Sequence, residues 1–443
     1  MNNDQLTIDN DQLPEGYKQT EVGVIPRDWE VRKIGSLGDV VRGASPRPAG
    51  NPRFFNGTYI PWLTVAALTN IPQYQLQVYE TYGGLTEEGS KHSRILEEGT
   101  LIIANSGATL GVAKLLCIKC CANDGIAAII NQKYGNKPFI CYYINTKTKD
   151  LREVVATGNG QPNLNTTLIK EISIPLPPTE AEQRSIAQAL SDVDRLIAAL
   201  EKAIDKKRAI KTATMQQILT GKKRLPGFGE GKGYQQTEVG VIPEDWNIRV
   251  LSEMCTKIQD GTHFSPKLGG NEFYYITSKN IGRGFLNLSN AEKIDKAQHE
   301  AIYKRCDVRK GDLLLTKDGV NTGNVALNEL DEEFSLLSSV ALLRFEPTDY
   351  EPAYFLHLIL SSESQKRIKD LMSGNAITRL TLEKIRKIPF PFPLLEEQRA
   401  IATVLSDMDT EIAALETRLA KTQSIKQGMM QQLLTGKTRL IDN

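Results

Sequence analysis

The sequence predicts an α+β protein in which two pseudo-symmetric globular domains are joined by two long helices that form an antiparallel coiled coil. Three observations predict this fold. At roughly 100 to 200 residues per domain, the 443 residues provide for two or three domains. Most of the sequence occurs twice, and each copy ends in a long segment of helical periodicity. The expected parts, in order, are a disordered tail at 1–15, a globular domain at 16–178, a helix at 179–225, a linker at 226–232, a second globular domain at 233–395 and a second helix at 396–443.

The duplication is carried by two blocks. Residues 16–26 return as residues 233–243, with the single change of Lys18 to Gln235. Residues 182–225 match residues 397–440 with 26 of 44 positions identical. Between these blocks, about 140 residues in each half share little identity. We therefore expect a shared fold that carries two different surfaces.

The variable segments read as strands joined by turns, because short β-branched and aromatic runs alternate with Gly, Asn and Pro. The expected strands are residues 59–63, 100–104, 273–277 and 312–316. A helix is expected at 352–372. Proline-rich stretches at 174–178 and 388–393 cannot continue a helix or a central strand, so they mark the domain exits.

The two repeated C-terminal blocks predict long helices. Apolar residues recur at alternating steps of four and three, which is a heptad seam. They are Ile186, Leu190, Val193, Ile197, Leu200 and Ile204, and then Ile401, Leu405, Met408, Ile412, Leu415 and Leu419. Gly221 and Gly436 suit the position just after a helix end, and each helix is expected to be about 50 Å long. Ordinary core packing is the alternative, but two matched seams favour mutual pairing about a pseudo-two-fold axis. We expect antiparallel pairing, with the domains at opposite ends of the rod.

Composition excludes some classes of protein. The chain is 40% hydrophobic and 24% charged, without an apolar run approaching the roughly 18 residues that span a bilayer. Residues 1–15 are polar and acidic, unlike a signal peptide, so we expect a cytoplasmic protein. Lys and Arg number 17 against 13 acidic residues in 16–178, and 20 against 22 in 233–395. Any face that binds nucleic acid must therefore be a local patch.

Neither a metal site nor a catalytic site is expected. Zinc would need a second ligand pair beside Cys117, Cys120, Cys121 and Cys141, so reduced thiols are expected instead. The stretch 51–54 lacks the second proline of a methyltransferase motif. Residues 436–438 resemble the tail of a phosphate-binding loop, but Gln431 replaces its first glycine. The histidines at 92, 263, 299 and 357 have no metal-ligand spacing.

Polar side chains on glycine-punctuated loops are the candidate DNA-binding residues, because such groups read base edges or hold phosphates. In the first domain they are Arg42, Ser45, Arg47, Arg53, Lys91, His92, Asn105, Ser106, Asn159, Gln161 and Asn163. In the second domain they are Gln259, Thr262, His263, Lys279, Asn280, Arg283, Lys317, Asn321, Asn324 and Arg379. Any one of them could instead be a turn residue or a solvated charge.

From residue 16 onward the chain resembles the specificity subunit of type I restriction-modification systems. The resemblance rests on Thr-Glu-Val-Gly-Val-Ile-Pro-x-Asp-Trp at 20–29 and 237–246, on Glu-Gln-Arg after each proline-rich exit, and on Met-Gln-Gln-(Ile/Leu)-Leu-Thr-Gly at each helix end. It implies two target-recognition domains on an antiparallel coiled coil, which read a split, asymmetric DNA sequence. It also implies two docked methyltransferase subunits and up to two motor-nuclease subunits.

This resemblance implies that the chain is a non-catalytic subunit. S-adenosylmethionine, ATP and magnesium are then expected in the partner subunits, and half-sites about one helical turn apart are expected in the DNA. The expected docking residues are Glu182, Gln183, Arg184, Glu397, Gln398 and Arg399. A stand-alone two-domain repressor and a coiled-coil scaffold without a DNA role remain open.

Overall fold

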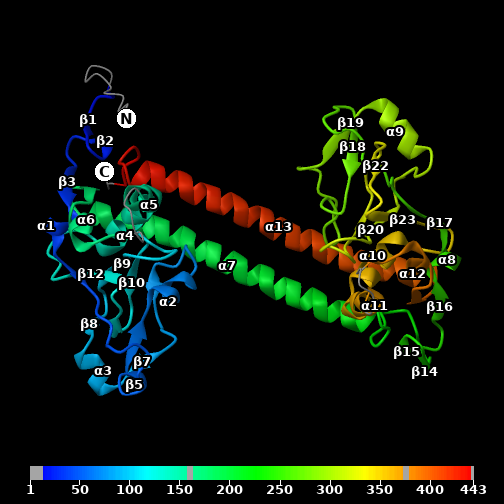
Figure 1. Ribbon diagram of the computed structural model, residues 1–443, viewed down its shortest axis with the longest axis horizontal. Helices are drawn as coiled ribbons and strands as arrows, with labels where there is room; N and C mark the ends of the chain where they lie inside the picture. Colours follow the sequence, from blue (N-terminus) through cyan, green and yellow to red (C-terminus); the bar gives the residue numbers. More distant parts are fainter. Residues whose placement is uncertain (1–12, 157–162, 373–378, 441–443) are drawn as a thin grey trace. The chain divides into compact units, whose positions relative to one another are not determined.

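The computed structural model describes residues 13–156, 163–372 and 379–440, and the chain divides into two compact units (Figure 1). The first unit contains residues 1–202 together with 416–443, and the second contains residues 203–415. Each unit therefore combines one globular part with a segment of both long helices. Most of the predicted disordered tail, residues 1–12, lies outside the described residues.

The first unit is built around two sheets. The strand order of the larger sheet is β4-β12-β9-β10-β6, with β4 Asp39–Arg42, β12 Ile126–Ile130, β9 Leu101–Ala104, β10 Ala113–Leu116 and β6 Gln77–Val78. The order of the smaller sheet is β7-β5-β11-β8, with β7 Gly84–Leu85, β5 Phe55–Leu63, β11 Cys120–Ala122 and β8 Arg94–Leu96. Two short pairs complete the strands: β1 Tyr17–Thr20 with β2 Gly23–Pro26, and β3 Glu30–Lys33 with β13 Ser173–Leu176. The helices are α1 Ile34–Leu37, α2 Val65–Thr69, α3 Glu87–Lys91, α4 Lys137–Thr146, α5 Thr148–Ala156, α6 Thr166–Lys170 and the start of α7 Glu180–Ile218.

The second unit repeats this plan with fewer strands. Its larger sheet has the order β17-β23-β20-β21, with β17 Cys255–Asp260, β23 Val340–Phe345, β20 Leu313–Thr316 and β21 Val325–Leu327. The other sheet is β19-β18-β22, with β19 Glu292–Ile294, β18 Phe273–Ile276 and β22 Ser335–Leu336. The pairs are β14 Tyr234–Thr237 with β15 Gly240–Pro243, and β16 Asn247–Val250 with β24 Pro389–Phe392. The helices are α8 Leu251–Met254, α9 Lys296–Tyr303, α10 Pro352–Leu360, α11 Ser362–Met372, α12 Leu382–Arg386 and α13 Leu395–Leu433.

Expected strands and structure agree closely, but the expected helix at 352–372 is wrong as a single element. The chain forms α10 and α11 instead, and Ser361 between them has extended backbone (ψ 153). The Ser361 hydroxyl accepts a hydrogen bond from the backbone N–H of Ser364 at 3.3 Å. The sequence of α10 and α11 reads as one helical pattern because α11 begins directly after Ser361, which caps its first turn.

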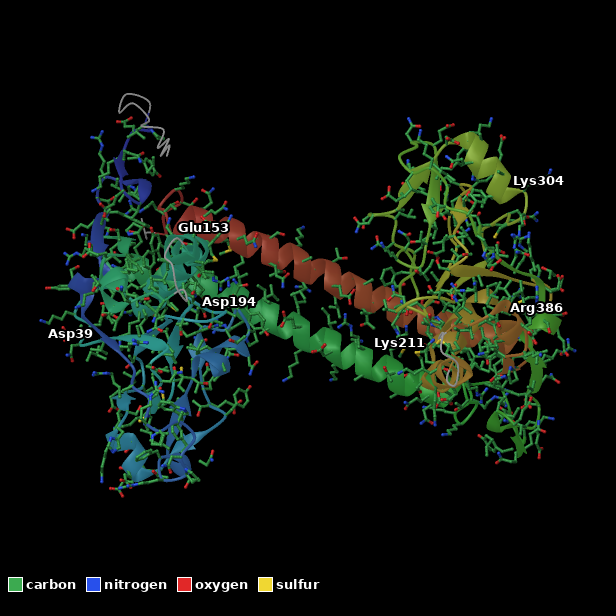
Figure 2. The ribbon with its side chains drawn as sticks, viewed as in Figure 1. Asp39, Glu153, Asp194, Lys211, Lys304 and Arg386 are labelled. Carbon is green, nitrogen blue, oxygen red and sulfur yellow. The ribbon has the colours of Figure 1, made fainter. Side chains whose placement is uncertain are left out.

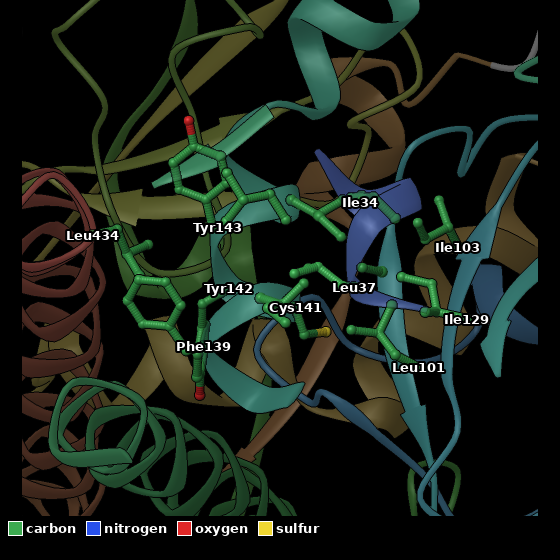
Figure 3. Close-up of a cluster of buried hydrophobic side chains, with 14 of the residues drawn as sticks. Ile34, Leu37, Leu101, Ile103, Ile129, Phe139, Cys141, Tyr142, Tyr143 and Leu434 are labelled. Carbon is green, nitrogen blue, oxygen red and sulfur yellow. The ribbon is translucent and has the colours of Figure 1, made fainter. Parts of the chain in front are cut away.

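The main core of each unit contains the end of a helix from the other repeat. In the first unit, Leu433 and Leu434 at the end of α13 pack in one buried cluster with Trp29 and Phe139. Figure 3 shows Leu434 and Phe139 in this cluster. In the second unit, Ile218 and Leu219 at the end of α7 take the matching place beside Trp246 and Phe355. The first globular part is therefore completed by a segment far along the chain, and the second by the segment that directly precedes it.

The predicted antiparallel coiled coil is confirmed by the ion pairs within each unit. In the first unit Asp194 of α7 meets Lys426 of α13 at 2.6 Å, and Glu182, earlier on α7, meets Arg439, later in the chain. In the second unit Lys207 pairs with Glu411, and Lys211, one turn further along α7, pairs with Asp409, which precedes Glu411. Partner numbers fall along one helix as they rise along the other, so the helices run antiparallel. Asp194 and Lys211 are labelled on α7 in Figure 2.

The heptad seam divides into two parts with different partners. Ile186 and Leu190 at the start of α7, and Ile401 and Leu405 at the start of α13, belong to the globular cores. For these first turns the alternative interpretation, ordinary core packing, is correct. Leu200, farther along α7, is 4% exposed and lies outside those clusters.

Candidate nucleic-acid interface

Both units place the same backbone turn where the first strand of the larger sheet ends. In the first unit Gly43 follows β4 and donates its N–H to the carbonyl of Ile126 at 2.8 Å. A Cβ atom on Gly43 would lie 2.1 Å from the carbonyl oxygen of Asn123, so only glycine fits. Gly261 after β17 is subject to the same restriction, because its Cβ would lie 2.0 Å from the carbonyl oxygen of Leu336. The chain beyond each glycine is thereby aimed toward the loop that precedes the central strand β12 or β23.

Four of the predicted DNA-binding residues of the first unit converge on Asp124. The Arg42 Nε donates to its carbonyl at 2.5 Å, and Asn105 Nδ2 donates to the same oxygen at 3.2 Å. The Ser45 hydroxyl donates to its carboxylate at 2.7 Å, and Arg47 lies 3.6 Å from that carboxylate. Sequence reasoning missed Asp124, although it stands in an Asn-Asp-Gly turn. Arg42 and Arg47 are exposed, so a charged, ordered surface forms around this carboxylate.

Asn105 and Ser106 start the next loop of the same surface. Asn105 is 1% exposed and its Nδ2 donates to the carbonyl of Asp124 at 3.2 Å, so its amide holds the loop rather than reading a base. Ser106 forms an isolated β-bridge with Asn163, which is exposed. The segment that returns at Asn163 therefore borders this surface. The predicted residues Asn159 and Gln161 lie outside the described residues.

A second group of predicted residues gathers around α3. Arg53 forms an ion pair with Glu88, and Lys91 lies 3.2 Å from Glu87. His92 is exposed and packs edge to face on Phe54, with ring centroids 5.2 Å apart. The exposed cations of this group carry their own counter-charges, which weakens their attraction for phosphate. Ser93, directly after His92, donates its hydroxyl to the carbonyl of Ala44 at 2.7 Å and ties the group to the Asp124 surface.

In the second unit Asp260, which directly precedes Gly261 as Arg42 precedes Gly43, is the centre of a buried charge network. Its carboxylate lies 3.2 Å from His263, 3.4 Å from Arg305 and 3.5 Å from Lys317. Gln259 also donates its amide to Asp260 at 3.3 Å. Lys317 is 8% exposed. Lys317 was predicted to bind DNA. That prediction is wrong for a free cation that meets a phosphate, because the charge of Lys317 is buried beside a carboxylate.

Asp318, next along the chain, extends the same network toward the surface. Its carboxylate lies 3.2 Å from Lys317 and 3.3 Å from the predicted residue Arg379. Arg379 and His263 are both exposed. Of the predicted DNA-binding residues, the network around Asp260 and Asp318 therefore exposes these two to solvent.

Asn280 and Thr262 are corrected to structural roles. Asn280 is 4% exposed, accepts a hydrogen bond from the backbone N–H of Thr277 at 2.9 Å and donates to the carbonyl of Asn287 at 3.1 Å. Thr262 is 5% exposed and its hydroxyl accepts from the N–H of Phe264 at 3.2 Å. Short polar side chains form such local bonds in turns, which their sequence pattern does not distinguish from recognition. Lys279, between them in sequence, is exposed.

Each unit has a hollow between its larger sheet and the helix that follows α4 or α10. In the first unit a hollow of about 670 Å³ is lined in part by Lys149, Arg152 and Lys114. In the second unit a hollow of about 570 Å³ is lined in part by Arg283, Lys366 and Lys369. Among the described lining residues neither hollow has an Asp or a Glu. Apart from Arg283, these cations were missed by sequence reasoning, although α5 and α11 have basic stretches that could have indicated them.

Burial changes the electrostatics of the first hollow. Lys114 is 1% exposed and donates its ammonium to the carbonyl of Pro72 at 3.0 Å. Removal from water lowers the pKa of Lys114 to about 8, since burial disfavours the charged form. Lys149 and Arg152 at the rim are exposed, and Lys149 has the carboxylate of Glu153 3.9 Å away as a partial counter-charge.

The predicted docking residues divide into two buried pairs and two exposed arginines. Glu182 and Gln183 are 2% and 6% exposed, and Glu397 and Gln398 are 2% and 1% exposed. Arg184 and Arg399 are exposed. The four buried side chains are wrong as surface docking residues, because they bind groups of their own unit.

The glutamines attach each globular part to its long helix. Gln183 accepts a hydrogen bond from the N–H of Asn136 at 2.7 Å and donates to the carbonyl of Pro177 at 2.9 Å. Gln398 does the same with the N–H of Glu351 at 3.0 Å and the carbonyl of Pro393 at 2.9 Å. This attachment explains the glutamine in the repeated Glu-Gln-Arg motif.

The glutamates belong to a duplicated arginine clasp. Arg439 binds Glu182 at 2.8 Å and Asp28 at 2.9 Å, and its guanidinium lies 5.8 Å from the ring centre of Trp29. Two carboxylates raise the pKa of Arg439 further above its usual range. The second clasp has Arg224 bound to Glu397 at 2.6 Å and to Asp245 at 2.8 Å, with Trp246 at 5.7 Å. Both arginines come from the stretch that follows a long helix.

The cysteines form no disulfide among the described residues, and Cys120, Cys121 and Cys141 are buried. Burial raises the pKa of the Cys120 and Cys141 thiols to about 12, so both stay protonated at neutral pH. In the part of the chain that the structure describes, no group of three or more His, Cys, Asp or Glu side chains is placed to hold a metal ion.

Comparison with known proteins decides the family. The family model described as the type I restriction modification DNA specificity domain matches residues 26–210 and again residues 243–427. The chain belongs to this family. The two matches confirm the two target-recognition repeats expected from the internal duplication. DNA sequence specificity is the class of function to which this family belongs.

Several relatives are similar over most of their length. The type I restriction enzyme MjaVIII specificity subunit of Methanocaldococcus jannaschii is 25% identical over 434 residues, which are 96% of this chain and 96% of that protein. The EcoBI specificity subunit of Escherichia coli is 25% identical over 295 residues, 62% of this chain and 60% of that protein. The crystal structure of the type I S subunit from M. genitalium has a TM-score of 0.59 at 16% identity, covering 91% of this chain and 96% of that chain. This likeness shows the fold.

One further finding concerns membranes. Within the described parts of the specificity-domain chain, no helix combines the length and the apolar character that a bilayer crossing requires.

Proposed function

We propose that this chain recognises a bipartite DNA sequence and assembles the methyltransferase subunits, and with them the restriction subunits, of a type I restriction-modification complex. The observation that carries the proposal is the duplicated loop surface. Each unit presents exposed Arg, Lys and His side chains on loops around an equivalent sheet. The family match to both repeats supports one reader for each half-site.

The two readers differ in the groups they offer. The first unit presents Arg42 and Arg47 around Asp124, and the second presents His263 beside Asp260 and Arg379 beside Asp318. Arginine is suited to guanine, and asparagine and glutamine to adenine, through pairs of hydrogen bonds to base edges. Unlike surfaces on one repeated framework suit an asymmetric site whose halves have different sequences.

The basic hollows supply the sequence-independent part of binding. Lys149 and Arg152 in the first unit, and Lys366 and Arg283 in the second, border hollows without described acidic lining residues. Contacts from such cations to phosphates position the duplex and release counterions. The chain as a whole has a net charge of only +1, so partner subunits contribute to the grip on DNA.

Chemistry belongs to the partners in this proposal. S-adenosylmethionine is then bound by the methyltransferase subunits, and ATP with magnesium by the restriction subunits. Exposed positions on α7 and α13, including Arg184 and Arg399, are the docking candidates that remain after the buried glutamates and glutamines are removed.

Genomic methylation tests the proposal. A host without restriction-modification systems is given the methyltransferase subunit alone, this chain alone, or both, and its DNA is read by single-molecule sequencing. We expect one split motif methylated only when both are present. Methylation by the subunit alone at the same motif would remove the need for this chain as a reader. Methylation by this chain alone, or S-adenosylmethionine turnover by the pure chain, would show that it is an enzyme.

A further inference from the structure

The loop between β20 and β21 exposes an apolar side chain that the charged surface around it does not explain. Val320 is 103% exposed, which means that the side chain is as open to water as in an extended peptide. Its neighbours in sequence are Gly319 and Asn321. A single exposed valine is common on protein surfaces, so its position and the rigidity of the loop must carry the argument.

The loop is held from several sides. Gly319 and Gly323 adopt left-handed backbone, with φ of +93 and +94, and tighten the turn at both ends. Thr322 donates its hydroxyl to the carbonyl of Gly319 at 2.6 Å. Asn321 donates to the carbonyl of Ser278 at 3.3 Å. These bonds leave Val320 at the tip of a braced turn.

Two features reduce the cost of binding through this tip. Gln365 of α11 donates its amide to the carbonyl of Gly323 at 2.9 Å and fixes the loop to a helix. Valine itself is stiff at χ1 because it is branched at Cβ. A rigid side chain on a rigid loop loses little freedom when it meets a partner.

The first unit contains the same turn with a different tip. The N–H of Leu110 bonds the carbonyl of Gly107 at 3.1 Å, as Thr322 bonds Gly319 at 3.1 Å. The N–H of Gly111 bonds the carbonyl of Ala104 at 2.8 Å, as Gly323 bonds Thr316 at 2.9 Å in the second unit. The residue in the place of Val320 is Ala108, which is also exposed. The framework is therefore constant while the size of the apolar tip varies between the two readers.

The surroundings favour DNA over an apolar protein surface. Val320 itself lines the hollow that includes Arg283, Lys366 and Lys369, and the described lining contains no acidic residue. A duplex held by its phosphates at these cations would bring a groove to the tip. In the major groove the apolar feature of the bases is the C5 methyl group of thymine.

We propose that Val320 is a specificity-determining residue that contacts a thymine methyl group in the second half-site, and that Ala108 occupies the matching place in the first reader. This inference rests on the proposed function. It adds the chemical group that is read and the side chain that reads it. The contact forms as the cations of the hollow fix the backbone of the same DNA segment.

The experiment removes the methyl group of thymine and the methyl groups of Val320 in separate steps. The complex of this chain with its methyltransferase subunit is titrated with duplexes in which each thymine of the second half-site is replaced, one at a time, by deoxyuridine. We expect one position at which replacement weakens binding about fourfold, the factor for ~0.8 kcal/mol per methylene-sized apolar group. The variant Val320→Ala is expected to bind the two duplexes equally at that position. Val241→Ala, at a 51% exposed valine of the β14–β15 hairpin, is the matched control and keeps the fourfold preference.

Each other outcome overturns the inference. A wild-type complex that prefers its site but is indifferent to every deoxyuridine replacement overturns the role of Val320 and leaves the proposed function standing. A Val320→Ala variant that keeps the full preference does the same. Loss of methyltransferase subunit from the purified variant complex would assign Val320 to a protein contact instead. A wild-type complex that binds random DNA as tightly as its own site overturns the proposed function, and this inference with it.

Discussion

Charged and polar residues that look alike in sequence have opposite fates in this structure. Lys317 and Asn280 are buried parts of the framework, whereas Arg379 and Lys279 close to them in the fold or sequence are exposed. The difference follows from distant partners, such as Asp260 for Lys317. Glycine and asparagine punctuation predicts where the recognition loops lie, but it cannot tell which side chain of a loop points inward.

His357 predicts a pH dependence of stability at the residue scale. It is 1% exposed, its Nε2 lies 3.2 Å from the hydroxyl of Ser406, and Asp409 and Lys211 face it from the long helices. Burial, with Lys211 nearby, lowers the pKa of His357 from 6.5 to about 4. Between these values the unfolded chain binds a proton that the folded chain does not, so stability is present above pH 6.5 and is lost as pH falls toward 4.

The expected size is ~1.4 kcal/mol for each pH unit within that window. Urea unfolding at about pH 7 and about pH 5 measures it. The variant His357→Gln lacks the titrating group, so its stability should fall less between the two conditions. Tyr142 stands at the matching place of the first unit, bonded to Asp194 at 2.7 Å, and does not titrate in this range. Equal pH dependence in wild type and variant would contradict the assignment.

The arginine clasp makes a second prediction at this scale. Replacing Arg439 by alanine leaves the carboxylate of Glu182, 2% exposed, without its ion pair. Leaving one buried charge unpaired costs about 3–5 kcal/mol. The matched control is Arg184→Ala, which removes an exposed pair with Glu180 on the same helix, worth ~0.3–0.5 kcal/mol. Thermal unfolding separates the two, and equal midpoints for both variants would show that the clasp contributes no stability.

At the scale of elements, the long helices perform two tasks along one apolar stripe. Their first turns complete the globular cores, and their ion pairs and apolar positions farther along hold the two helices together. The heptad pattern predicted the helices, its duplication their antiparallel pairing, and Gly221 and Gly436, with φ of +68 and +71, their ends. It could not show where core packing gives way to pairing, because both bury the same residue types.

Leu200 tests the pairing. It is 4% exposed, while Leu196, one turn earlier on α7, is 40% exposed. Leu200→Asp places a charge in an apolar environment without a partner and should destabilise the protein by several kcal/mol. Leu196→Asp carries the same loss of helix propensity, less than ~1 kcal/mol, and serves as the control. Leu415, half-buried on α13, should respond between these two. Similar unfolding midpoints for the variants at 196 and 200 would refute a buried seam at Leu200.

At the scale of the whole molecule, repetition was the strongest information in the sequence. The matched blocks predicted two equivalent repeats, and the family model matches the chain twice, at 26–210 and 243–427. The recognition surfaces were less predictable for a physical reason. Asp124 and the cations Arg152 and Lys366 join the surface through folding of segments that are far apart in sequence.

Specificity should therefore be modular. Residues 41–172 of the first repeat, exchanged for the matching segment of a relative, should change one half of the methylated motif. The other half and the spacer should stay as they were, because α7 and α13 are untouched. Sequencing of methylated DNA from the host reads the result. A swap that alters both halves, or neither, would contradict the model of two independent readers.

The clasp at Arg439 also sets an order of events during translation. The core of the first unit includes Leu433 and Leu434, and its clasp closes with Arg439, yet most of that unit is synthesised before residue 203. The ribosome must pass through the entire second domain before the first can be sealed. Arg224, by contrast, emerges before the domain that it clasps. A released chain that ends after residue 415 should thus hold a finished second domain and an open first one, which is exposed to proteases.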